Sequence, residues 1–254
     1  MVPSAVDPLA SPIWDFLRPQ LFADAPIQFD PRLTVLMPGM AENQHVYPVA
    51  VDARGLGAID QIKIWSDLSP AQVALTYTVS TGAPFVGTRI KLDQRTPVRG
   101  AARLKATGIW LIGGQWVSAA GGGCSKAPVS RVDGNWAKTI GEIRGQARRE
   151  GDSIRLRLAY KHPMDTGFVD NIPAFYIETL TVRGPGGVVL AKLDTLQSVS
   201  EDPGFTLLVR AGAEVSVLHT EARDTNGNVY AARVPIAAKP RRPTTGLSSS
   251  CCQK

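Results

Sequence analysis

The sequence predicts an all-β protein, built as two tandem immunoglobulin-like β-sandwiches with a short N-terminal helix. The chain has 254 residues of which 44% are hydrophobic, enough to form more than one buried core. Most of its apolar residues occur in short runs that alternate with polar ones. Gly, Pro or Asp bound these runs at regular spacing, as is typical of sandwiches.

The one helix predicted near the N-terminus follows Ser11-Pro12. Trp14, Leu17 and Leu21 recur at helical spacing after this start, and Pro26 ends the pattern. One apolar face on a short helix predicts that the helix lies on a sheet.

The first sandwich is predicted to occupy residues 10–125. Ile62 and Ile64 flank Lys63, and Val73 to Val79 alternate in the same way, as half-buried antiparallel strands require. The predicted strands are 33–37, 46–52, 59–65, 73–79, 88–92, 98–105 and 109–118.

A linker is predicted over residues 126–150, where charge, Gly and Pro are mixed and a helix over 136–149 is possible. The second sandwich, 151–238, opens with Ile154 and the alternating residues after it, and contains about six strands. Asn226-Gly227 predicts a type I′ hairpin turn. Residues 239–254, rich in Pro, Ser and Arg, are predicted to form a flexible tail.

Composition narrows the classes of function. The net charge is +6 and the pI about 9.4, but the basic residues are dispersed, which favours an anion or an acidic protein as partner over nucleic acid. No stretch is apolar for long enough to span a membrane, and the first ten residues lack the pattern of a secretory signal. Three cysteines without a CxxC pair predict neither a disulfide framework nor a metal site, and no cofactor is expected.

The most informative stretch is a glycine run that ends in a cysteine. Gly121, Gly122 and Gly123 precede Cys124, and Ser125 and Lys126 follow it. Three glycines leave the backbone compliant, which predicts a thiol displayed on a flexible arm. A cysteine so placed acts through its sulfur, or else the stretch is a Gly-rich hairpin that happens to carry a small residue, and composition leaves both interpretations open.

Two further hypotheses concern ligands and charge. Lys126 is expected to lower the pKa of the Cys124 thiol by placing a cation beside it. Met37, Met40 and His45 have the soft and imidazole ligands that suit copper, although a turn with apolar methionines is the favoured interpretation. Cys251 and Cys252 lie in the predicted tail, where chemistry is not expected.

Residues 161–168, Lys-His-Pro-Met-Asp-Thr-Gly-Phe, with 171–177 and 198–203, resemble the signature of the Z subunit of the sulfur-oxidation (Sox) carrier protein. The first half is similar to the Y subunit, in its leading helix, its strand pair from Ile62 to Val79, residues 87–90 and the Gly-rich cysteine arm. The chain therefore resembles a Y–Z fusion of the kind described as a quinoprotein dehydrogenase-associated SoxYZ-like carrier.

The resemblance implies a carrier and not an enzyme, with no catalytic residue. In the family, the Y-subunit cysteine holds sulfur intermediates while periplasmic enzymes process them, and that role falls on Cys124 here. It implies a mature periplasmic protein, with sulfur-oxidation enzymes, c-type cytochromes and a quinoprotein dehydrogenase as partners. The sequence departs from the family because the cysteine is internal and Ser125-Lys126 replace the downstream glycines. The alternative is a docking adaptor for a quinoprotein dehydrogenase or cytochrome, without a covalent carrier role.

Overall fold

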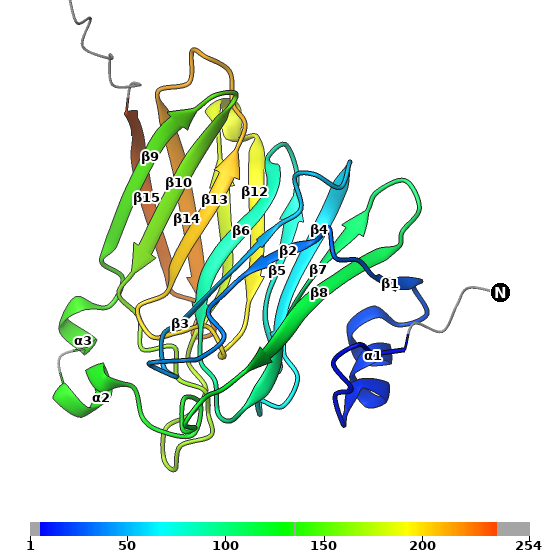
Figure 1. Cartoon of the computed structure of the whole chain (residues 1–254). Coiled ribbons are helices and arrows are strands. Elements are labelled where there is room, and N and C mark those ends of the chain that lie inside the picture. The colour runs from blue at the N-terminus through cyan, green and yellow to red at the C-terminus, as the bar shows by residue number, and fades with distance from the viewer. Residues whose placement is uncertain (1–5, 135, 238–254) are drawn as a thin grey trace, which may run out of the picture.

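The computed structural model describes residues 6–134 and 136–237. Within these residues, fifteen strands form one continuous ladder that folds back on itself into two facing layers, sheet A and sheet B (Figure 1). The layers join where β15 runs parallel to β9, with Ile236 opposite Ala147. The helices of the described residues lie outside the two layers.

Sheet A is the larger layer and contains strands from both halves of the chain. Its strands, in spatial order, are β1 (Ile27–Phe29), β8 (Trp110–Val117), β7 (Thr96–Leu104), β4 (Ile59–Ser66), β5 (Val73–Val79), β12 (Val189–Thr195), β11 (Ile177–Arg183), β14 (Val217–Asp224) and β15 (Val229–Ala237).

Sheet B also crosses from one half to the other. Its strands, in spatial order, are β9 (Ile143–Glu150), β10 (Ser153–Tyr160), β13 (Gly204–Val209), β6 (Ala83–Ile90), β3 (Tyr47–Asp52) and β2 (Thr34–Leu36).

The prediction of an all-β, immunoglobulin-like fold with an N-terminal helix is confirmed. The structure adds that the two halves share both sheets. β5 pairs antiparallel with β12, placing Leu75 opposite Thr195, and β6 pairs antiparallel with β13, placing Gly87 opposite Thr206. Each junction gives hydrogen-bond partners to strand edges that two separate sandwiches would leave open.

One hydrophobic core continues between the layers across the junction of the two halves. It includes Ile62 and Tyr77 from the first half and Leu180 and Leu207 from the second, all fully buried. Alternation along the strands directs these side chains inward. The halves are therefore stabilised by common packing as well as by shared strands.

The N-terminal helix, α1 (Trp14–Phe22), lies on the outer face of sheet A in the first half (Figure 1). Trp14 and Phe22 pack with Trp65 and Trp110 in a second, smaller core. Buried Arg99 stacks over the Trp14 ring at 4.7 Å from its centroid. The prediction of a helix laid on a sheet is confirmed.

The range 126–150 contains two short helices, α2 (Val129–Asp133) and α3 (Trp136–Thr139), and then β9. The predicted possibility of a helix over 136–149 is wrong beyond Thr139. Gly141 takes a positive φ of 84°, which ends the helical segment. Gly145 faces Val234 so closely that a Cβ would lie 2.6 Å from it, which suits a strand packed on the core.

The predicted type I′ turn between β14 and β15 is also wrong. Only Gly227 has positive φ there, at 86°, whereas a type I′ turn needs it at both central residues. The Asp224 carboxylate instead accepts hydrogen bonds from the backbone N–H groups of Asn226 and Asn228, at 2.9 and 3.0 Å. This side-chain cap holds a longer loop that the Asn-Gly pair alone does not indicate.

No helix within the described residues is long and apolar enough to cross a membrane. The predicted tail, 239–254, lies outside the described residues, as do Cys251 and Cys252.

Candidate functional site around Cys124

The glycine run and Cys124 lie in the segment between β8 and α2, which passes along one end of both halves (Figure 1). Gly121 and Gly122 take positive φ values of 99° and 85°, which favour glycine. Gly123 is seated against backbone, because an added Cβ would lie 2.4 Å from the Leu92 oxygen and 2.5 Å from the Gln44 oxygen. The glycines therefore allow a close approach to the rest of the protein.

Cys124 is buried, with 0% of its surface exposed, so the prediction of a thiol displayed on a compliant arm is wrong for this conformation. The physical reason is the glycine run itself. A backbone without side chains fits closely beside another chain segment, and here the Gly123 N–H donates to the Leu92 carbonyl at 3.1 Å. The same freedom that permits display also permits burial.

Asp93 holds the arm from the side of the first half. Its Oδ1 accepts hydrogen bonds from the backbone N–H of Cys124 at 3.1 Å and of Ser125 at 3.2 Å, and from the Ser125 hydroxyl at 3.0 Å. Three donors converge on one carboxylate oxygen. These bonds fix the arm through two backbone N–H groups and one hydroxyl, and none of them involves the thiol.

Thr166 holds the arm from the side of the second half. Its hydroxyl donates a hydrogen bond of 2.7 Å to the carbonyl oxygen of Cys124. Thr166 belongs to the motif over residues 161–168, so this motif meets the cysteine in space although about forty residues separate them in the chain. The sequence shows the motif, but only the tertiary structure shows that the motif contacts Cys124.

Lys91 is the cation next to the thiol. Only 3% of Lys91 is exposed, and its ammonium donates to the carbonyl oxygens of Met164 and Gln197, the latter at 3.0 Å. Met164 takes a φ of 51°, an uncommon backbone conformation for a residue other than glycine. A buried lysine thus links the end of β6 to the second half, beside the cysteine.

Burial dominates the protonation of this pair. It raises the pKa of the Cys124 thiol to about 12, although the Lys91 charge acts to lower it and Asp93 to raise it further. Burial also lowers the pKa of Lys91 to about 8, opposed by Cys124, Asp165 and Glu201. At neutral pH the seated cysteine is therefore a thiol and not a nucleophilic thiolate.

The expected role of Lys126 is not supported, because Lys91 is the cation whose charge lowers the Cys124 pKa. Lys126 is exposed and its side chain lies over Gly122, where an added Cβ would be 2.9 Å from its Cε. Nothing in the sequence singled out Lys91, since a lysine after a strand is ordinarily solvated. Its role arises only because the second half covers it.

The helix that follows Cys124, α2, is bound to residues of the second half. The carboxylate of Glu201 accepts hydrogen bonds from the first N–H groups of α2, those of Val129 at 2.9 Å and Ser130 at 2.7 Å. Arg131, also in α2, forms an ion pair with buried Asp165. The helix that follows the arm is thereby tied to the second half.

His162, in the same motif, is buried and contacts the Phe175 ring, with 4.5 Å between ring centroids. Its Nδ1 accepts the backbone N–H of Met164 at 3.1 Å, and its Nε2 lies 3.7 Å from Asp224 without a hydrogen bond. Burial lowers the pKa of His162 to about 4. The histidine is therefore a neutral structural residue at neutral pH.

Met40 and His45, two of the alternative copper ligands, have other surroundings in the structure. Met40 is 65% exposed and pairs with Ser118 through a single bridge, while the His45 backbone N–H donates to Asn43 at 2.9 Å. Within the described residues, no three His, Cys, Asp or Glu side chains are grouped as a metal site.

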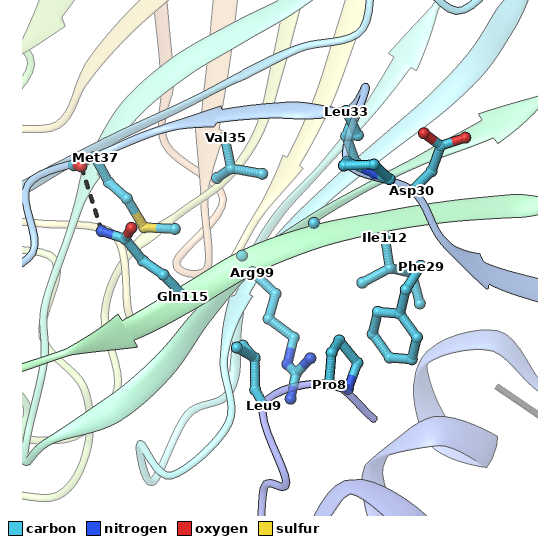
Figure 2. A pocket seen from close by; sticks show the side chains of 13 residues that line it. Pro8, Leu9, Phe29, Asp30, Leu33, Val35, Met37, Arg99, Ile112 and Gln115 are labelled. Atoms are coloured by element: carbon cyan, nitrogen blue, oxygen red, sulfur yellow. Dashed lines mark hydrogen bonds between the residues drawn. The ribbon is translucent and has the colours of Figure 1, made fainter. Parts of the chain in front are cut away.

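A separate hollow of about 410 Å³ lies between the N-terminal segment and strands β2 and β8 (Figure 2). Figure 2 shows the Arg99 side chain reaching toward Leu9, with Phe29 at the side. The Arg99 guanidinium is already bound by the carboxylates of Asp7 at 2.7 Å and Asp67 at 3.0 Å. Because these two carboxylates neutralise the charge of Arg99, this arginine is not a free cation for a ligand in the hollow.

Two family models match the chain in tandem. The model described as sulfur oxidation protein SoxY matches residues 18–124, and the model described as sulphur oxidation protein SoxZ matches residues 143–235. The chain is a SoxY–SoxZ fusion. The SoxY match ends on Cys124 itself, and the SoxZ match includes Thr166. In this fusion, the SoxY and SoxZ parts meet at the cysteine.

A solved structure, that of the sulfur carrier protein SoxY from Chlorobium limicola f thiosulfatophilum, is similar to part of the SoxY–SoxZ chain. The two are 19% identical, with 41% of this chain and 93% of that chain covered, at a TM-score of 0.37. No curated protein matches the chain.

Proposed function

We propose that the chain is a covalent sulfur carrier, which holds a sulfur-containing group on the Sγ of Cys124 and offers it to sulfur-oxidation enzymes. The observation that carries the proposal is that the SoxY match ends on Cys124, directly behind three glycines. The chain is proposed to be a substrate of its partners and not a catalyst. The periplasm is the proposed compartment, with c-type cytochromes and a quinoprotein dehydrogenase as further partners.

The loading reaction is a transfer between sulfur atoms. The Cys124 thiolate attacks the outer sulfur of a donor persulfide, a new S–S bond forms, the donor's S–S bond breaks, and the donor leaves as a thiolate. The Cys124 proton passes to solvent, the outer sulfur keeps its own, and no net oxidation occurs. The thiolate is the reactive species, so the reaction requires the arm to leave the site that keeps Cys124 protonated.

Displacement of the arm is a local step in this proposal. The groups that hold Cys124 are the Asp93 carboxylate and the Thr166 hydroxyl, together with the Gly123 hydrogen bond to Leu92. Gly121 and Gly122, at positive φ, supply the backbone freedom for the movement. The sheets and the core need not open, so the step draws on local stability and not on global unfolding.

Tetrathionate tests the carrier role because its inner sulfur accepts a thiolate. The attack forms Cys–S–S–SO₃⁻ on the protein and releases thiosulfate, so atoms and charges balance. We expect intact-mass and peptide mass spectrometry to find this adduct on Cys124 in a Cys251→Ser/Cys252→Ser background, and dithiothreitol to remove it. Cys124→Ser in the same background is the control. Absence of the adduct, even in a Gly123→Ala variant whose arm cannot seat, would refute the proposal.

Burial of Cys124 favours a second candidate, a docking adaptor for a periplasmic dehydrogenase or cytochrome in which the cysteine is a packing residue. In that case Cys124→Ala leaves partner binding and pathway flux intact. Loss of flux with unchanged partner binding in Cys124→Ala assigns the carrier role instead.

A further inference from the structure

The outer face of β9 and β10, in sheet B, carries an unusual cluster of positive charge. Arg148 on β9 lies directly opposite Arg155 on β10 in the antiparallel register, and Arg157 is the next outward residue along β10. These three arginines, with Gln146 and Glu150, line one hollow of about 140 Å³. We call this group the arginine face. Like charges directly across a strand pair are destabilising, so the protein keeps the arrangement at a cost.

Most of this positive charge is uncommitted. Arg155 forms an ion pair with Glu150 at 2.9 Å and lies 5.7 Å from the Phe85 ring centroid. Within the described residues, the side chains of Arg148 and Arg157 have no hydrogen bond, ion pair or ring contact. Glu150 is the one carboxylate that lines this hollow, so the arginine face retains a net positive charge.

A second, longer hollow of about 600 Å³ adjoins the arginine face and crosses from β10 over β13, β6 and β3 to β2. Its wall includes Arg155, Arg157 and Arg89, with Leu36 and Phe85 as apolar residues. Outward-facing Gly87 and Gly204, with Ala50 and Ala159, keep its floor low. Strands of the SoxY part and the SoxZ part both contribute, so the hollow exists only where the two parts share sheet B (Figure 1).

The length of this surface distinguishes a polypeptide from a small anion. Five neighbouring strands span roughly 19 Å at about 4.8 Å between strands, several times the size of a sulfate ion. Arginine and aromatic side chains are enriched at protein interfaces. Positive charge, small floor residues and exposed Leu36 together fit an extended chain with carboxylates and apolar side chains.

We propose that the arginine face and the adjoining hollow bind an acidic, partly apolar segment of a partner protein. The binding does not involve Cys124, so it is independent of the proposed carrier function. The site lies on the outside of sheet B, whereas the thiol is held at the end of the sheets by Asp93 and Thr166. A partner docked on the arginine face therefore contacts a different surface from the one that holds Cys124.

The probe for this proposal is a short fluorescein-labelled peptide of alternating glutamate and leucine, titrated by anisotropy. We expect it to bind, to bind more weakly as salt rises, and to lose affinity about tenfold or more in Arg148→Ser/Arg157→Ser. The matched control is Arg183→Ser/Arg233→Ser, which removes the same charge from the outer face of sheet A and is expected to change affinity less than twofold. Ala159→Glu, which keeps every arginine, is expected to weaken binding as well.

Three outcomes overturn the proposal. One is equal binding of a peptide with lysine in place of glutamate. Another is equal loss of affinity in both double variants, which reports overall charge only. The third is complete displacement of the peptide by sodium sulfate at matched ionic strength where sodium chloride displaces little, which assigns the face to a small anion. Circular dichroism of each variant verifies that the fold is retained.

Discussion

The hydroxyl of Thr166 donates a hydrogen bond of 2.7 Å to the carbonyl oxygen of Cys124. This bond joins a residue of the SoxZ part to the last residue of the SoxY match. The SoxZ part therefore contacts the cysteine directly, in addition to sharing the core and both sheets.

Replacing Thr166 with Val removes this bond at nearly constant volume, together with the hydroxyl that accepts the Phe168 N–H at 3.2 Å. A typical net hydrogen bond contributes about 1 kcal/mol, so the seated arm should open roughly fivefold more often. We expect iodoacetamide to label the Cys124 peptide faster by about that factor. Thr181→Val, the same change on β11, serves as the control. Equal labelling rates in the two variants would show that Thr166 does not hold the arm.

Two variants of Asp93 distinguish the effect of its hydrogen bonds to the arm from the effect of its negative charge. Asp93→Asn and Asp93→Ala both remove the negative charge that raises the Cys124 pKa, but only Asn keeps an oxygen acceptor. Loss of the acceptor shared by three donors should destabilise the seated arm by roughly 2 kcal/mol. Iodoacetamide should therefore label Cys124 about 30-fold faster in Asp93→Ala than in the native chain. The Asn variant should fall between the two. If Asn and Ala label equally fast, charge and not hydrogen bonding controls the arm.

Gly123→Ala should prevent the arm from seating. The added Cβ would meet backbone oxygens of Leu92 and Gln44 at 2.4 and 2.5 Å, and backbone cannot move aside as a side chain does. We expect Cys124 labelling to approach the rate of a free thiol while the far-ultraviolet circular dichroism is unchanged. Gly39→Ala, at a site with no atom within 4 Å, is the control and should label like the native protein. Continued protection of Cys124 in Gly123→Ala would contradict the seated geometry.

The raised pKa of Cys124 predicts its alkaline behaviour. The thiol has an ordinary pKa of 9.0 and a seated pKa of about 12, so the folded chain keeps a proton that the unfolded chain releases between these values. Stability from this group is complete below pH 9 and is lost as pH rises toward 12. Alkylation of the native Cys124 peptide should therefore continue to rise above pH 9, whereas the urea-unfolded chain reaches a plateau there. A native plateau at pH 9 would place the thiol in solvent.

The lowered pKa of His162 predicts how the stability of the protein changes at acid pH. Burial lowers its pKa from 6.5 to about 4, so the unfolded chain binds a proton between these values that the folded chain does not. Stability from the neutral histidine is therefore lost as pH falls from 6.5 toward 4, by on the order of 3 kcal/mol. In His162→Gln the decline in melting temperature over that range should be much shallower. His219→Gln, at an exposed position on β14, should decline like the native protein.

Several features followed from the sequence. Alternation in runs such as Ile62 to Ile64 predicted the strands, and the apolar face of Trp14, Leu17 and Leu21 predicted the helix on the sheet, because both depend on local periodicity. The motif over 161–168 and the Gly-rich cysteine indicated the two families that the matches confirm. The helix predicted as possible over 136–149 was wrong because contact with the core decided that segment.

By itself, then, the sequence determined the all-β class, the order of the two parts and the position of the cysteine that follows the glycine run. Each of these depends on residues that are neighbours in the chain. Only the tertiary structure decided that Cys124 is buried, that Lys91 and not Lys126 is its cation, and that Thr166 contacts it. The physical reason is that burial and charge pairing depend on which distant segments meet. A glycine run permits both a displayed and a seated arm, and the contacts made by Asp93 and Thr166 select the seated one.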